Sequence, residues 1–107
     1  MSGRVVRLSY RYVPEFYYKR IPLHQRHIEY WRGCARQGVQ ALGGSTFPYG
    51  GAELFLRGTD APAAERLARG DPFVAAGLVS ELAVEELAEL GEGRADAAFR
   101  AFVYICK

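Results

Sequence analysis

The order in which the hydrophobic periodicity changes along the chain is the feature that most constrains its fold. Residues 4–13, RVVRLSYRYV, alternate between two sets of side chains, as a half-buried strand does, and Pro14 ends this pattern. Residues 22–37 follow helical spacing instead, with Pro22 in the first turn and Gly38 after the last residue. The chain therefore begins with a strand, followed by a helix that packs against a sheet.

The second part of the chain repeats the change from strand to helix. Residues 39–44 predict a short buried strand, which a glycine-rich loop, GGSTFPYGG, joins to a third strand at 52–58. Residues 59–69 predict a helix with Thr or Asp as its N-cap, and residues 78–87 predict a fourth strand. This order of elements, βαββαβ, predicts an α+β fold, the ferredoxin-like sandwich.

A sheet of this kind carries its helices on one face, so its other face needs a second cover. A chain of 107 residues, half of them hydrophobic, is long enough for one packed domain and too short for two. We therefore expect a second copy of the chain to cover the open face, giving a homodimer. Residues 1–90 are predicted to form the ferredoxin-like domain. Residues 91–107 are predicted to form a C-terminal extension, helix or strand, that packs on the core, on the partner or at the mouth of a cleft.

Composition excludes several classes of function. The 14 Lys and Arg residues are scattered and face 12 Asp and Glu residues, a net charge of +2, so we expect no nucleic-acid partner. Cys34 and Cys106 have neither CxxC nor Cys/His spacing, which predicts reduced thiols and no structural zinc. No apolar run suits a signal peptide or approaches the about 20 residues that span a bilayer. We expect a cytoplasmic protein with no membrane partner, and its Arg and Ala content suits a bacterial genome.

One break in the helical pattern places a lone carboxylate beside apolar residues. In RGDPFVAAGL, Gly70 ends a helix and Pro72 starts another turn, so Asp71 is predicted to be an N-cap that accepts from the amide of Phe73 or Val74. His27 lies on the apolar stripe of the first helix. A carboxylate that orients an imidazole and stabilises its charged form makes an acid/base pair.

Two segments resemble a known family. HIEYWRGCARQGVQALGGS, in which His27 lies eleven residues before Gly38 and Gly44 lies six further on, is followed by GDPFVAAGLV. Together they resemble the YCII-related (YciI-like) family over residues 4–87. The resemblance implies the fold of the dimeric α/β barrels and a cofactor-free site built around His27 and Asp71. Arg20 resembles a basic position before the family's histidine, although here Arg26 directly precedes His27 and His24 adds a second imidazole.

The predicted site consists of the catalytic pair and a set of substrate-binding residues: His27 and Asp71, with Arg20, His24, Trp31, Gly44, Ser45, Phe47 and Phe73. Aromatic residues are expected in the core or the cleft wall, namely Tyr10, Tyr12, Tyr17, Tyr18 and Trp31. An aromatic lining suits a flat ring as substrate. Simpler interpretations stay open. In these, Asp71 is only an N-cap, His27 is only a core residue and Cys34 is an inert buried thiol. No metal is expected, since the two histidines lack further ligands, and the glycine-rich loop lacks the spacing of a nucleotide-binding loop.

Two functions follow from this pattern. The first is a small cofactor-independent enzyme that uses the His27–Asp71 pair for isomerisation, elimination, cyclisation or dehalogenation of a cyclic or aromatic metabolite, in bacterial specialised metabolism. The second is a non-catalytic small-molecule-binding or accessory protein that uses the same cleft.

Overall fold

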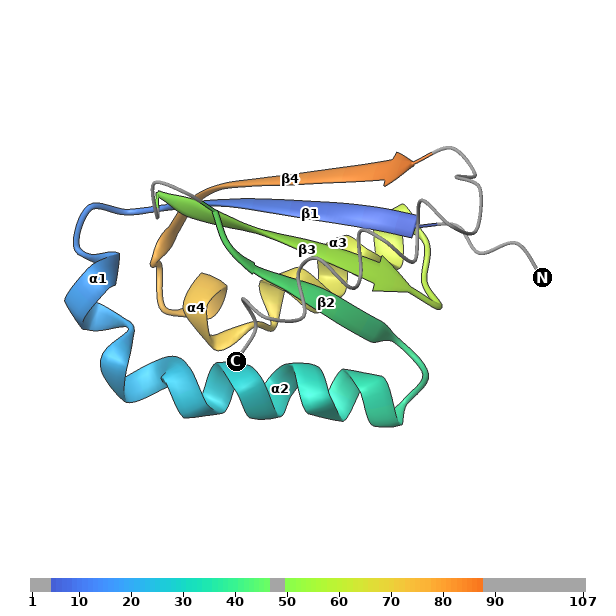
Figure 1. The fold of residues 1–107 in the computed structure, drawn as a ribbon, viewed down its shortest axis with the longest axis horizontal. Helices are drawn as coiled ribbons and strands as arrows, with labels where there is room; N and C mark the ends of the chain where they lie inside the picture. Colours follow the sequence, from blue (N-terminus) through green and yellow to red (C-terminus); the bar gives the residue numbers. More distant parts are fainter. Residues whose placement is uncertain (1–4, 47–49, 88–107) are drawn as a thin grey trace.

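The computed structural model describes residues 5–46 and 50–87, and the predicted extension at 91–107 lies outside them (Figure 1). The elements follow the predicted order, with three short additions: β1 (Val5–Tyr12), α1 (Phe16–Lys19), the 3-10 turn η1 (Ile21–Leu23), α2 (His24–Arg36), β2 (Gln40–Ser45), β3 (Gly51–Arg57), α3 (Ala61–Arg69), α4 (Pro72–Ala75) and β4 (Val79–Leu87).

The strands form one antiparallel sheet in the order β2-β3-β1-β4. Strands β1 and β3 are central, and Leu8 of β1 pairs with Leu54 of β3. On its other side, Leu8 pairs with Val84 of the outer strand β4. This strand order and the two helical crossings confirm the predicted ferredoxin-like α+β fold.

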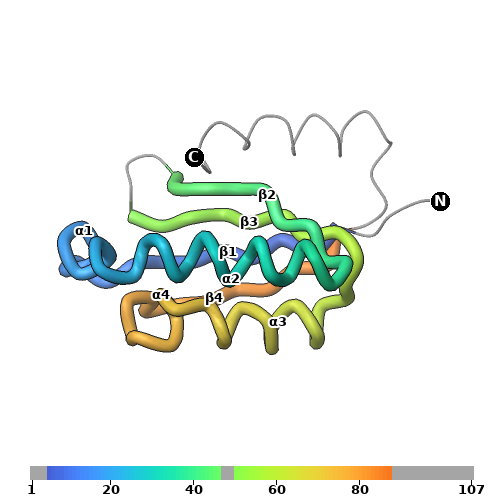
Figure 2. Tube along the Cα trace, turned by 90° about the horizontal axis from the view of Figure 1, so that it is seen from below, coloured from blue at the N-terminus to red at the C-terminus, as the bar shows by residue number. Residues whose placement is uncertain are grey.

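Both long helices lie on the same face of the sheet (Figures 1 and 2). Helix α2 packs against β2, and α3 packs against β1 and β4. The alternation of β1 directs Val6, Leu8 and Tyr10 toward these helices, where all three are buried with Trp31 and Leu56. On the opposite face, no helix among the described residues covers the sheet.

The first helical segment differs from its prediction. We expected one helix over 22–37, whereas α2 begins at His24, and Pro22 lies in the preceding 3-10 turn η1. Helix α1 was not predicted, because its four residues are too few to show a period. It buries Phe16, while Tyr17 and Tyr18 stay exposed. The predicted N-cap of α3 is Asp60, whose side chain accepts from the amide of Ala63 at 3.0 Å.

The described part of the chain contains no helix with the length and apolar character that a membrane span requires.

Short helix α4 ends in a turn that leads the chain into β4. The amide of Leu78 donates to the carbonyl of Phe73 and the amide of Gly77 donates to that of Val74, both at 3.0 Å, as in a Schellman motif. Gly77 has φ 79°, a left-handed conformation that favours glycine. Buried Leu78 also packs against Phe73. The turn therefore fixes Phe73 on a rigid corner.

The surroundings of Gly43 and Gly33 predict opposite effects of a Gly→Ala substitution on the stability of the protein. A Cβ at Gly43 in β2 would lie 2.0 Å from the carbonyl oxygen of Glu53, so Gly43→Ala must push two paired strands apart, at a cost of about 1–3 kcal/mol. At Gly33 inside α2 the nearest atom is a side-chain nitrogen 3.7 Å away, and Gly33→Ala should stabilise by about 0.5–1 kcal/mol. Urea unfolding of both variants measures these shifts, and shifts of the same sign would contradict the strand geometry.

Candidate active site

The candidate site is built around the carboxylate of Asp71, which has no solvent-exposed surface. Its position follows from the local sequence, because α3 ends with Gly70 as C-cap and Pro72 opens α4. The residue before a proline avoids helical conformation, and Asp71 is extended at φ −61° and ψ 127°. A side chain at Gly70 would collide with Tyr30, since a Cβ there lies 2.6 Å from its phenol oxygen. The loop therefore passes close to α2.

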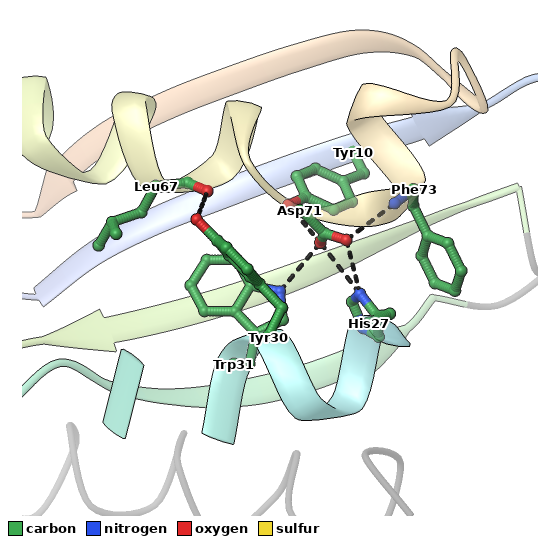
Figure 3. A network of polar contacts seen from close by, with 7 residues as sticks. All are labelled: Tyr10, His27, Tyr30, Trp31, Leu67, Asp71 and Phe73. Atoms are coloured by element: carbon green, nitrogen blue, oxygen red, sulfur yellow. Dashed lines mark hydrogen bonds and ion pairs between the residues drawn. The ribbon is translucent and has the colours of Figure 1, made fainter. Parts of the chain in front are cut away.

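Four donors from separate parts of the chain reach this carboxylate (Figure 3). Oδ1 accepts from the amide of Phe73 at 3.0 Å, as the predicted N-cap requires, and from Nδ1 of His27 at 2.8 Å. Oδ2 accepts from the phenol of Tyr10 and from Nε1 of Trp31, both at 2.9 Å. An ionised carboxylate has about four acceptor positions, so these donors satisfy it. Burial without them would cost several kcal/mol.

His27 is held from two directions. Its Nδ1 lies 2.8 Å from Oδ1 and 3.0 Å from Oδ2 of Asp71, and its ring stacks on that of Phe73 with centroids 4.2 Å apart and planes 12° apart. Because an ionised carboxylate only accepts, the contact assigns the proton to Nδ1 and leaves Nε2 of the neutral ring as an acceptor. The side chain keeps 19% of its surface exposed. The ring is thus oriented and still accessible.

Two of the donors were not predicted in this role. Trp31 was expected in the cleft and Tyr10 in the core or the cleft wall, and neither was assigned to Asp71. A signal was available for Trp31, which follows His27 by four residues and therefore lies on the same face of α2. For Tyr10 the sequence shows only that it shares the inner face of β1, because no local pattern places it opposite a residue 61 positions away.

A cavity of about 710 Å³ adjoins His27, walled by α2 on one side and by β2 and β3 on the other. Six of the predicted substrate-binding residues line it, namely Arg20, His24, Trp31, Gly44, Ser45 and Phe73. The seventh, Phe47, lies outside the described residues. Aromatic side chains add to the wall: Tyr10, Tyr12, Phe16 and Tyr17. The Tyr12 and Phe16 rings stack, and Phe16 meets Phe73 edge to face.

Burial keeps the phenols around the site protonated. Burial, followed by the charge of Asp71, raises the pKa of Tyr10 and of Tyr12. Burial is also the main reason that the pKa of Tyr30 rises to about 12, and its phenol donates to the carbonyl of Leu67 at 2.5 Å. These groups therefore act as hydrogen-bond donors near neutral pH.

Cys34 is buried below this network. Burial raises the pKa of its thiol, and this effect is larger than the opposite effect of the neighbouring Tyr30. The thiolate is the nucleophilic form, so burial disfavours reaction at this thiol, in line with the simpler interpretation. In residues 5–46 and 50–87, no three His, Cys, Asp or Glu side chains gather where they could hold a metal ion.

Comparison with known proteins identifies structural relatives. No protein-family model and no curated protein matches the chain. A solved structure of 5-chloro-2-hydroxyhydroquinone dehydrochlorinase (TftG) from Burkholderia phenoliruptrix AC1100, in complex with 2,5-dihydroxybenzoquinone, is similar with a TM-score of 0.68 and 20% identity, over 83% of this chain and 97% of that one. Rv0793 from Mycobacterium tuberculosis is similar with a TM-score of 0.55 and 23% identity, over 85% and 98%. At these identities the likeness shows a shared fold.

The raised pKa values predict a loss of stability in alkali. A phenol whose pKa is higher in the folded than in the unfolded chain stabilises the fold fully below about pH 10 and less as the pH rises further. Urea unfolding between about pH 8 and about pH 11 should show this decline, with a smaller slope in Tyr10→Phe. Tyr18→Phe, at an exposed residue of α1, is the control. Equal slopes in wild type and Tyr10→Phe would contradict the burial of this phenol.

Proposed function

We propose that this protein is a cofactor-independent enzyme in which His27 transfers a proton on a cyclic or aromatic metabolite. The observation that carries the proposal is the 2.8 Å contact between Nδ1 of His27 and buried Asp71, beside a cavity that His27 itself lines. His27 is the catalytic residue, and Asp71 acts through it as a positioning residue. An oriented neutral imidazole has the geometry of a general base.

The chemistry of a proton-transfer cycle can be assigned to named atoms. Nε2 of His27 takes a proton from a C–H or O–H group of the substrate, and the carboxylate of Asp71 stabilises the imidazolium that forms. In an elimination, the electron pair of the broken C–H bond forms the new double bond, the leaving group departs with its own bonding pair, and the imidazolium then gives its proton to solvent. In an isomerisation, the imidazolium returns the proton to another atom of the same substrate.

The aromatic lining of the cavity supports a planar ring as substrate. A ring that enters it meets the aromatic surfaces of Tyr12, Phe16 and Trp31. TftG, which shares this fold, is a dehydrochlorinase of a chlorinated hydroxyhydroquinone and was solved with a dihydroxybenzoquinone. This precedent favours elimination or dehalogenation of a hydroxylated ring among the reactions that a His–Asp pair can perform.

Substitutions in the pair test the proposal. Chlorinated hydroquinones and hydroxyhydroquinones are offered to the protein, and chloride release and the product spectrum are measured. His27→Gln removes the base, so kcat should fall by about a hundredfold or more. Asp71→Asn should lower kcat far more than it changes KM, because it disturbs the tautomer and orientation of the ring.

Asp60→Asn is the matched control for Asp71→Asn. Asp60 is also an N-cap, since it accepts from the amide of Ala63, but it is exposed and lies at the opposite end of α3 from Asp71. Its variant should keep wild-type activity. Circular dichroism checks that all variants are folded. A substrate turned over equally by wild type and His27→Gln would contradict the proposal, and a ligand that binds and is recovered unchanged by mass spectrometry would favour the alternative, a binding or accessory protein.

The homodimer belongs to this proposal, together with a cytoplasmic location and a role in bacterial metabolism. The sheet face opposite α2 and α3 carries no helix among the described residues, and a second copy is the cover we expect. Analytical ultracentrifugation should give twice the chain mass of 11.9 kDa. The mass of one chain at all concentrations would contradict the dimer.

A further inference from the structure

The charged side chains that face the cavity carry one sign. The guanidinium groups of Arg20 and Arg32 line it, and no Asp or Glu belongs to the part of its lining that the structure describes. The nearby carboxylate of Asp71 lies behind His27, has no exposed surface and is saturated with donors. A ligand in the cavity therefore meets a positive field, which favours an anion.

Arg20 is the cation best placed to make a direct contact. It precedes α2 and is half-buried, and it forms no ion pair with any residue in 5–46 or 50–87. Its guanidinium carbon lies 5.6 Å from the centre of the Tyr17 ring, a cation–π contact that restrains the group and leaves its N–H donors available. Arg32 differs, since its guanidinium lies 3.9 Å from the carboxylate of Glu29.

Tyr12 supplies a second donor in the wall of the same cavity that Arg20 lines. Its ring stacks on Phe16 in the cavity wall, and the positive charge of Arg20 acts on its phenol. Burial and the charge of Asp71 outweigh that effect and raise the pKa of Tyr12, so the phenol keeps its proton. A negatively charged oxygen between the two side chains would accept hydrogen bonds from a guanidinium and from a hydroxyl, and charge-assisted bonds of this kind are the strong ones.

We propose that the cavity binds its ring-shaped ligand as an oxyanion, with the negatively charged ring substituent at Arg20 and Tyr12 and the ring beside His27. An ionised phenol, an ionised enol of a hydroxyquinone and a ring carboxylate share this chemistry. This inference deepens the proposed function by naming the charge state of the substrate, and it rests on that function only for the identification of the ligand as a substrate.

Binding of three ligands that share a para-nitrophenyl ring separates the effect of ligand charge from the effect of ligand shape. Para-nitrophenol ionises near neutral pH and its phenolate absorbs visible light, para-nitrobenzoate is a carboxylate, and para-nitroanisole is neutral. At a mildly acidic pH, where free para-nitrophenol is mostly protonated, wild-type protein should increase the phenolate band and should bind para-nitroanisole at least about tenfold more weakly. Tighter binding of para-nitrobenzoate than of the phenolate would assign the oxyanion to a carboxylate and would also support the proposal.

Arg20→Gln tests the residue. It should weaken binding of the anionic probe by about tenfold to a hundredfold, the factor for one charged hydrogen bond, and abolish the phenolate shift. Its affinity for para-nitroanisole should change by less than about twofold. Arg26→Gln removes the same charge from an exposed position of α2 outside the cavity lining and should match wild type. Tyr12→Phe should weaken binding of the anion less than Arg20→Gln does.

Two results would overturn the inference: equal affinity for para-nitrophenol and para-nitroanisole in wild type, or the same loss of anion binding in Arg26→Gln as in Arg20→Gln. These results are distinct from failure of the proposed function. If the anion binds in an Arg20-dependent way but no hydroquinone is turned over, the oxyanion site is supported and the proposed enzymatic function is contradicted. If turnover depends on His27 but neither on Arg20 nor on the charge of the ligand, the proposed enzymatic function is supported and the oxyanion site is contradicted.

Discussion

The carboxylate of Asp71 is the constraint on which the rest of this structure depends. A charge without any exposed surface is stable only when its acceptor positions are filled, and here the donors come from β1, α2 and α4. These elements are far apart in the sequence, so the network forms only when the sheet, the long helix and the short corner are all in place. Loss of one donor would leave a buried acceptor unsatisfied, which costs about 1–3 kcal/mol.

The same arrangement separates two electrostatic roles. The negative charge of Asp71 is used entirely inside the protein, where it accepts from Nδ1 of His27 and orients the ring. The surface that a ligand meets carries the guanidinium groups of Arg20 and Arg32 instead. The proposed base, which is backed by a carboxylate, and the positive guanidinium groups of the cavity fit the anionic substrate that we propose. If the carboxylate were exposed in the cavity, it would repel such a ligand.

The sequence predicted the layout of this protein better than its details. The order of strands and helices followed from changes in period, and GDPF between α3 and β4 was enough to predict a capping aspartate. The pairing of His27 with Asp71 was predicted from the chemistry of the two side chains together with a family resemblance, because no local pattern relates residues 44 positions apart. Helix α1 was not predicted, because four residues are too few to show a helical period. Tyr10 and Trp31 were recognised as inward-facing, but their hydrogen bonds to Asp71 depend on tertiary packing that periodicity does not encode.

The order Gly-Asp-Pro-Phe has a physical explanation in the assembled site. Gly70 lets the loop pass beside Tyr30, and Pro72 holds Asp71 in the extended conformation of an N-cap. Phe73 then contacts both members of the pair, because its amide donates to Asp71 and its ring stacks on His27. The Schellman turn after α4 fixes Phe73 in turn. A break that looks like a simple helix stop therefore positions the carboxylate, the imidazole and one wall of the cavity together.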